Sequence, residues 1–118
     1  MLSLIAALLM QPAFVKGPLD VEVPNAILDL HNKYGLCWDS RFDVARVRSR
    51  EDFKKETERA IAACAGEKAA LKLEAEARLA RTSDYADAER RRAAIAEAFD
   101  GFDRLRRAMA AGQGTGTR

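Results

Sequence analysis

Residues 84–111 read DYADAERRRAAIAEAFDGFDRLRRAMAA, and this stretch decides the fold because its apolar side chains recur every three or four residues. The positions with this spacing are Tyr85, Ala88, Ile95, Phe99, Phe102 and Met109, with Leu105 broadening the stripe. Such a period places apolar side chains on one face of an α-helix. The stretch therefore predicts a helix over 84–111, and Gly112 is a typical C-terminal stop.

Residues 49–81 predict a second long helix. Ser49 is a good N-cap, and Glu51 and Asp52 suit the first turn of a helix. Inward positions at three- and four-residue intervals are Phe53, Thr57, Ala60, Ile61, Cys64, Leu71, Ala75 and Leu79. Gly66 lies within this run, and whether it breaks the helix is left open. Thr82, Ser83 and Asp84 then predict a break and a restart, since each can cap a helix.

The residues before 49 predict a cover for these two helices. Residues 18–24 (PLDVEVP) suggest an extended arm, and a short helix is expected over 25–34, between a cap at Asn25 and a stop at Gly35. After it, Trp38 and Phe42 are expected to close one end of the core, with Val44 and Val47 pointing inward. The predicted fold is all-α: an antiparallel hairpin of helices 49–81 and 84–111, covered by the short helix.

The N-terminus reads MLSLIAALLMQPAFV and carries no charged side chain before Lys16. Its length fits the apolar core of a secretory signal peptide better than a membrane-spanning helix, which needs about 20 residues. The alternative is a short buried helix of a cytosolic protein, since no good cleavage site follows. We therefore divide the chain into 1–17 (signal peptide or apolar segment), 18–111 (one α-helical domain) and 112–118 (flexible tail).

Cys37 and Cys64 are the only cysteines, and their spacing excludes a CxxC motif. In an oxidising compartment we expect them to form a disulfide bond. In a reducing cytosol both would be small buried apolar residues.

Composition narrows the function classes. The 118 residues carry 20 Lys and Arg against 18 Asp and Glu, a formal net charge of +2, and a single His. A nucleic-acid-binding domain usually has a clear basic excess. Asp29, His31, Asp39 and Asp43 are too scattered to indicate a metal site. No Ser has a nearby His partner, so we expect no enzyme, no metal and no cofactor.

Two arginine groups, Arg90–Arg92 and Arg104–Arg107, look like phosphate-binding clusters. Consecutive residues point about 100° apart on a helix, so neither group forms one patch. Acidic residues also stand at i,i+4 positions in the favourable order. The expected pairs are Asp87–Arg91, Asp100–Arg104, Asp103–Arg107, Glu51–Lys55 and Glu74–Arg78. We therefore expect a solvated, self-paired face.

The apolar N-terminus, the two spaced cysteines and the Ala62–Glu67 stretch (AACAGE) within Ala-rich helices resemble small Ala/Arg-rich helical envelope proteins of Gram-negative bacteria. The resemblance covers most of the chain at the level of composition and layout. It implies a periplasmic compartment and an α-helical fold, and it implies no chemistry.

The leading hypothesis is a small exported helical protein, periplasmic or secreted, that binds an unknown protein partner or acts structurally. An alternative is a cytosolic adaptor with a buried N-terminus that can self-associate. A third is a binder of nucleic acid or anionic surfaces through the last helix. The candidate interaction residues are Trp38, Phe42, Arg90, Arg91, Arg104 and Arg107.

Overall fold

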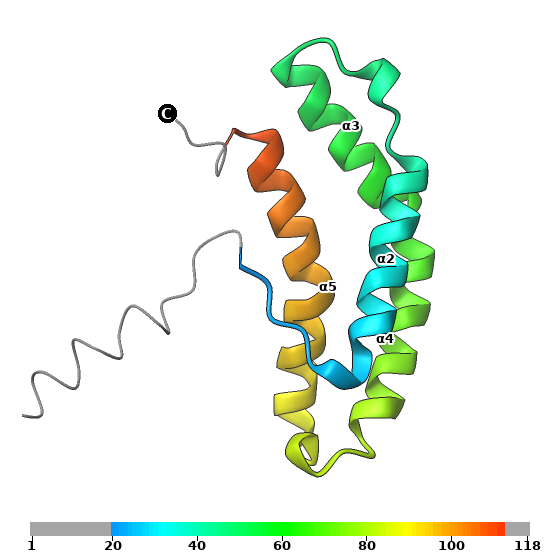
Figure 1. Ribbon diagram of the computed structural model, residues 1–118, viewed down its shortest axis with the longest axis vertical. Coiled ribbons are helices and arrows are strands. Elements are labelled where there is room, and N and C mark those ends of the chain that lie inside the picture. Colours follow the sequence, from blue (N-terminus) through cyan, green and yellow to red (C-terminus); the bar gives the residue numbers. More distant parts are fainter. Residues whose placement is uncertain (1–19, 113–118) are drawn as a thin grey trace, which may run out of the picture.

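The computed structural model describes residues 20–112, which form helices and connecting turns with no strand among them (Figure 1). The helices are α2 (Leu28–Arg41), α3 (Arg50–Ala63), α4 (Ala65–Leu79) and α5 (Ala88–Ala110). Short 3-10 turns are η1 (Asn25–Ile27), η2 (Val44–Arg46) and η3 (Ser83–Tyr85). The all-α class is confirmed. The predicted signal peptide and nearly all of the predicted tail lie outside the described residues.

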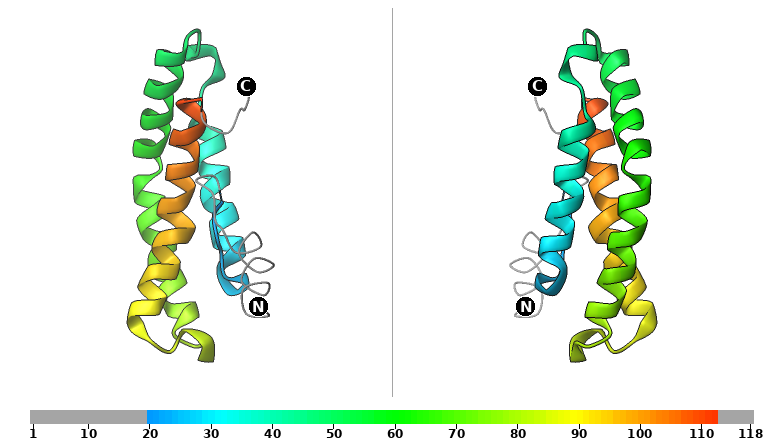
Figure 2. Two further views of the ribbon diagram at one scale, coloured as in Figure 1. Left: turned by 90° about the vertical axis from the view of Figure 1, so that its left-hand side faces the viewer. Right: turned by 90° about the vertical axis from the view of Figure 1, so that its right-hand side faces the viewer.

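Helices α3 and α4 replace the single long helix expected over 49–81. They follow each other end to end along one edge of the molecule (Figure 2). The junction is Cys64, whose backbone N–H donates to Ala60 at 3.1 Å and whose carbonyl accepts from Lys68 at 2.9 Å. Gly66 lies inside α4, so it is not the break. Ser49 caps α3 as predicted, accepting from the backbone N–H of Asp52 at 3.0 Å.

Helix α2 is longer than the helix predicted over 25–34. It continues through Gly35 because Leu30, Tyr34, Cys37 and Trp38 keep one buried face in register. Gly35 is a point of close approach and not a stop, since a Cβ there would lie 3.4 Å from the ring of Phe102. The expected cap at Asn25 was wrong as well: Asn25 begins η1, and no side chain caps that turn.

Helix α5 begins later than predicted, at Ala88. Its cap is Asp87, whose carboxylate accepts from the backbone N–H of Arg90 at 2.8 Å. Thr82 instead closes α4, because its hydroxyl donates back to the Leu79 carbonyl at 2.8 Å. Gly112 follows the helix with a φ of 88°, the left-handed conformation that suits glycine, and this confirms the predicted stop.

The core lies between α2, the α3–α4 rod and α5. Both α2 and α5 run antiparallel to the rod (Figure 1). Tyr34 of α2 meets Phe99 and Phe102 of α5 edge to face, with ring centroids 6.0 and 5.1 Å apart. Helix α2 therefore forms one side of the core and packs against both the rod and α5. Its partners in the rod and α5 are Ala60, Cys64, Leu71, Ala75, Leu79, Ile95 and Ala98.

One end of the core is closed by aromatic rings, as predicted. Trp38 stacks on Phe42 at 4.6 Å, and Phe42 meets Phe53 of α3 at 5.8 Å. The prediction that Val44 points inward was wrong: its side chain is 73 % exposed. The chain is held here by polar contacts instead, since the buried carboxylate of Glu56 accepts from the backbone N–H of Asp43 at 2.8 Å. Hydrogen bonds from Arg59 lower the pKa of Glu56 to about 2.

Residues 20–24 lie along α5 as an irregular arm, in agreement with the expected extended segment. Arg104 donates to the carbonyl of Asp20 at 2.9 Å, and the backbone N–H of Glu22 donates to Glu97 at 3.4 Å. Val21 packs over Gly101, and a Cβ on Gly101 would lie 3.3 Å from a methyl group of Val21. The absence of a side chain at Gly101 therefore lets the arm approach the helix.

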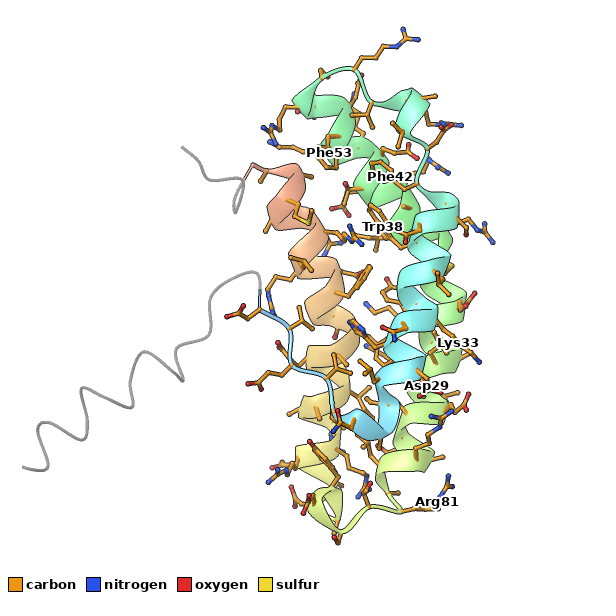
Figure 3. The ribbon with its side chains drawn as sticks, viewed as in Figure 1. Asp29, Lys33, Trp38, Phe42, Phe53 and Arg81 are labelled. Atoms are coloured by element: carbon orange, nitrogen blue, oxygen red, sulfur yellow. A yellow bond between two sulfur atoms is a disulfide. The ribbon has the colours of Figure 1, made fainter. Side chains whose placement is uncertain are left out.

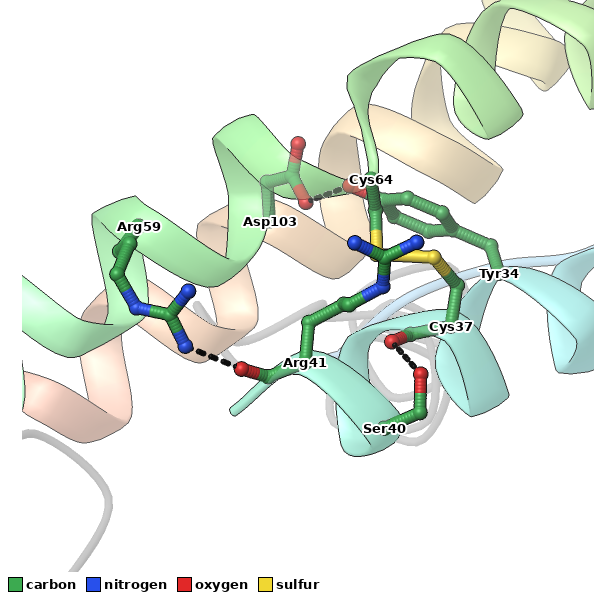
Figure 4. The surroundings of a disulfide bond; sticks show 7 residues. All are labelled: Tyr34, Cys37, Ser40, Arg41, Arg59, Cys64 and Asp103. Carbon is green, nitrogen blue, oxygen red and sulfur yellow. Dashed lines mark hydrogen bonds between the residues drawn. A yellow bond between two sulfur atoms is a disulfide. The ribbon is translucent and has the colours of Figure 1, made fainter. Parts of the chain in front are cut away.

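Cys37 and Cys64 are joined by a disulfide bond, with their Cα atoms 6.2 Å apart (Figure 4). Both are buried, and the bond links the C-terminal half of α2 to the α3–α4 junction. On the same side, the guanidinium of Arg59 donates to the carbonyl of Arg41. The disulfide and this contact hold the C-terminal half of α2 against the rod.

Replacing both cysteines, Cys37→Ala/Cys64→Ala, is expected to lower the free energy of unfolding by roughly 3–4 kcal/mol under oxidising conditions. The loss comes mainly from the loop entropy that the bond removes from the unfolded chain. Chemical denaturation of both proteins, with and without reductant, measures it. The difference in free energy of unfolding between the two proteins should nearly disappear when the wild-type bond is reduced. Equal stability under oxidising conditions would contradict a stabilising bond.

Candidate functional site

A strip along the outward side of α4 carries no charged residue over four turns, although the exposed Glu67 and Glu74 border it. We define this α4 outer face by its exposed residues Gly66, Ala69, Ala70, Leu73, Ala77 and Ala80. They fall on one side of the helix because the inward positions are Leu71, Ala75 and Leu79, all buried. Leu73 is the one large side chain on this face, and 75 % of it is exposed.

The outer side of α3 is quite different, although the two helices form one rod. Its exposed positions include Glu51, Lys55 and Glu58, the composition of a solvated helix face. An exposed Leu alone needs no explanation. A charge-free exposed face centred on a Leu, directly after a charged one, marks α4 as the best candidate for contact with another molecule.

An apolar groove runs beside Leu73, between α4 and α5. Its volume is about 390 Å³, and its lining residues are Lys72, Leu73, Glu76, Arg92, Ile95 and Ala96. Lys72 and Glu76 are held by α5, since Lys72 pairs with Asp100 at 3.0 Å and Glu76 with Arg91 at 2.7 Å. The floor of the groove is therefore apolar, with the paired charges of Lys72 and Glu76 at its border and the exposed side chain of Leu73 next to it.

The predicted apolar site at Trp38 and Phe42 is largely closed. Trp38 is only 5 % exposed, with the guanidinium of Arg106 lying 4.3 Å over its ring. Figure 3 places Trp38, Phe42 and Phe53 together at the end of the core. Trp38 is therefore a core residue with a cation–π partner, and it presents no docking surface of its own.

A hydrogen-bonded network crosses the core beside the disulfide. Tyr34 donates from its hydroxyl to buried Asp103 at 2.6 Å, and Lys68 reaches the other oxygen of Asp103 at 2.7 Å (Figure 4 shows the first bond). Lys68 also pairs with Asp100 at 2.6 Å. Burial and the bond to Asp103 raise the pKa of Tyr34 well above its ordinary value. The network joins α2, α4 and α5 and is structural, because each member faces a partner within the chain.

Most arginines of α5 are engaged within the molecule, although not with the predicted partners. Arg91 binds Glu76, Arg104 binds Glu97 at 3.1 Å, and Arg107 forms a two-pronged pair with Glu58 at 2.7 and 2.9 Å. Arg90 lies 5.0 Å over the ring of Tyr85.

Among the expected i,i+4 pairs, all of which fall in the described part of the chain, Glu74–Arg78 is formed at 2.9 Å. The three pairs expected within α5 were wrong, because Asp87 caps α5 while Asp100 and Asp103 face α4. The pair Glu51–Lys55 is not formed either.

The scattered acidic residues do not converge either. Asp29 pairs with Arg78 of α4 at 2.7 Å, and this contact lowers the pKa of Asp29. His31 packs edge to face on Phe102, and burial lowers its pKa. Over residues 20–112, no group of three or more His, Cys, Asp or Glu side chains could hold a metal ion. In the same range, no helix is long and apolar enough to cross a membrane.

Comparison of the chain with protein-family models, with curated proteins and with solved structures finds no match.

The α4 outer face was missed in the sequence, although its signal was present. Gly66, Ala70, Leu73, Ala77 and Ala80 repeat at three and four residues, one face away from the predicted core positions. Two apolar stripes on one Ala-rich helix can be assigned to core and surface only when the neighbouring helices are known.

Tyr34→Phe tests the network between α2 and α5. Removing the hydroxyl leaves a buried oxygen of Asp103 without this donor, which should cost on the order of 1–3 kcal/mol in the free energy of unfolding. Tyr85→Phe is the matched control, because no hydrogen bond to the Tyr85 hydroxyl is formed among the described residues, and it should change stability little. Denaturant unfolding measures both. Equal effects would argue against a special role for Asp103.

Proposed function

We propose that this protein is a small, disulfide-linked helical module that acts by binding another protein through the α4 outer face and the adjoining groove. The observation that carries the proposal is Leu73, exposed by 75 % at the centre of a face without charge. We propose no catalytic role and no cofactor.

Helix–helix docking is the mode of binding that this surface supports. Gly and Ala on the outer face allow a partner backbone to approach closely, and Leu73 can serve as the anchor that fills a pocket in the partner. The groove beside it offers Ile95 and Ala96 to one side chain of the partner. The arrangement resembles the recognition of an amphipathic helix by an apolar surface.

An oxidising compartment, periplasmic or extracellular, is part of the proposal. Its support is the buried Cys37–Cys64 bond, since such bonds persist mainly in exported proteins. The alternative, a cytosolic adaptor, would keep both thiols reduced and residues 1–17 in place.

Binding to nucleic acid or anionic surfaces through α5 is supported less well. Arg91, Arg104 and Arg107 each hold a carboxylate at 3.1 Å or less. A phosphate would have to displace these ion pairs before it gained a partner. Protein binding through α4 requires no such exchange.

Photo-crosslinking in the native host tests the binding surface. A photoreactive benzoyl-phenylalanine in place of Leu73 is expected to form a covalent adduct with a partner protein on irradiation. The matched control is the same substitution at Leu36, which is 67 % exposed on α2. An adduct at position 73 and none at position 36 supports the proposal. No adduct at position 73, or equal adducts at both, would remove the α4 outer face as the site.

The intact mass of protein from the native host tests the compartment. We expect a mass short of the N-terminal segment, with thiols that alkylate only after reduction. A full-length mass with two freely alkylated cysteines would instead place the protein in the cytosol.

A further inference from the structure

We propose that the partner at the α4 outer face is a second copy of this chain, docked with its α4 antiparallel to the first. The inference rests on the proposed function and names its partner. The support for an antiparallel dimer comes from the charges that border the α4 outer face and from the shape of that face.

Two side chains of opposite sign mark the ends of one flank of the face. Glu67 lies in the first turn of α4, and Arg81 follows its last residue by two positions; Figure 3 shows Arg81 at the far end of the helix, pointing away from the core. Both are exposed, and neither has an ion-pair partner among the described residues. Ala80 keeps a right-handed helical conformation after α4, so helix spacing over the 14 residues places the two about 21 Å apart and about 40° from each other around the axis, on the same flank.

An antiparallel copy places these charges opposite each other. With a two-fold axis near the middle of α4, Glu67 of one copy faces Arg81 of the other, and the same pair forms a second time by symmetry. In a parallel two-fold arrangement the two copies of Glu67 would be level but on opposite sides of the interface, so neither Glu67 nor Arg81 would meet its opposite charge. Charge complementarity thus selects a second copy and also its direction.

On the opposite flank of the face, the antiparallel copy also brings opposite charges together. Lys72 and Glu76 border the groove, and the same axis sets Lys72 of one copy beside Glu76 of the other. Their present partners Asp100 and Arg91 remain beside them, so this flank becomes a small network of alternating charge. Glu74 would approach its own counterpart near the axis, but Arg78 neutralises it at 2.9 Å within each chain.

The apolar centre of the face fits the same register. In this register Leu73 is level with position 75 of the other copy, so it lies closest to Leu73 and Ala77 of that copy, and the small residues of the face let the two helices approach closely. Each projecting Leu73 has the groove of about 390 Å³ at its side. A projection and a hollow side by side on one surface are what a self-complementary two-fold contact requires.

The experiment is a charge exchange on full-length oxidised protein, followed by sedimentation velocity over a dilution series at low salt. We expect a reversible dimer of the wild type. Glu67→Arg alone and Arg81→Glu alone should each weaken the dimer about tenfold, since two ion pairs become two repulsions. The double variant Glu67→Arg/Arg81→Glu should recover the wild-type dissociation constant.

Two further variants separate this contact from any other. Leu73→Glu should abolish the dimer, and Leu36→Glu on α2 should leave it unchanged. Thermal melting of every variant confirms that the chain is folded. A wild type that stays monomeric at every concentration, a double variant no better than the singles, or a dimer insensitive to Leu73→Glu would overturn the inference.

The failure of this inference is distinguishable from the failure of the proposed function. Cross-links from position 73 to a different protein would overturn the second copy and keep the binding surface. An absence of cross-links would remove both.

Discussion

Asp103 is the residue on which the arrangement of the helices depends. It is a carboxylate 3 % exposed in the middle of α5, and it accepts bonds from Tyr34 of α2 and Lys68 of α4. Apolar helix faces can slide past each other at little cost, whereas a buried carboxylate is tolerated only where its donors meet it. Three helices therefore have one register in which Asp103 is satisfied. Burial alone would lower the pKa of Lys68, but Asp100 and Asp103 raise it above its usual value, so the ammonium stays charged.

The disulfide acts next to this network and by a different means. The bond stabilises the packing of α2 on the rod by lowering the conformational entropy of the unfolded chain. The Asp103 contacts instead favour one folded arrangement over others. The aromatic closure around Trp38 completes the same end of the core. Asp100 and Asp103 of α5 pair with lysines of α4, and Arg91, Arg104 and Arg107 of α5 pair with carboxylates of the same molecule. The α4 outer face itself carries no charged residue, and Glu67 and Arg81 at its edge have no ion-pair partner among residues 20–112.

The sequence predicted the elements whose signals are local. The cap at Ser49, the stop at Gly112 and the inward positions from Thr57 to Leu79 follow from side-chain chemistry and period. Prediction from the sequence failed where the local structure depends on contact with a residue far away along the chain. Gly35 reads as a stop until Phe102 is placed beside it, and Asp100 and Asp103 read as partners of Arg104 and Arg107 until α4 offers Lys68. An i,i+4 pair is worth only about 0.3–0.5 kcal/mol, so a partner on another helix readily replaces it. The α4 outer face was lost for the same reason, since outward and inward stripes of alanine look alike along the chain.

The Cys37–Cys64 bond also closes a covalent ring, which contains the end of α2, the η2 turn and all of α3. The exposed turn at Val44 is the type of segment that proteases cut first. A cut there opens the ring but leaves both parts of the chain attached through sulfur. A cut in the turn between α4 and α5 has the opposite result, because α5 lies outside the ring and is held by noncovalent contacts alone. The two ends of this small protein therefore differ in whether the fragments stay covalently linked after the backbone is cleaved.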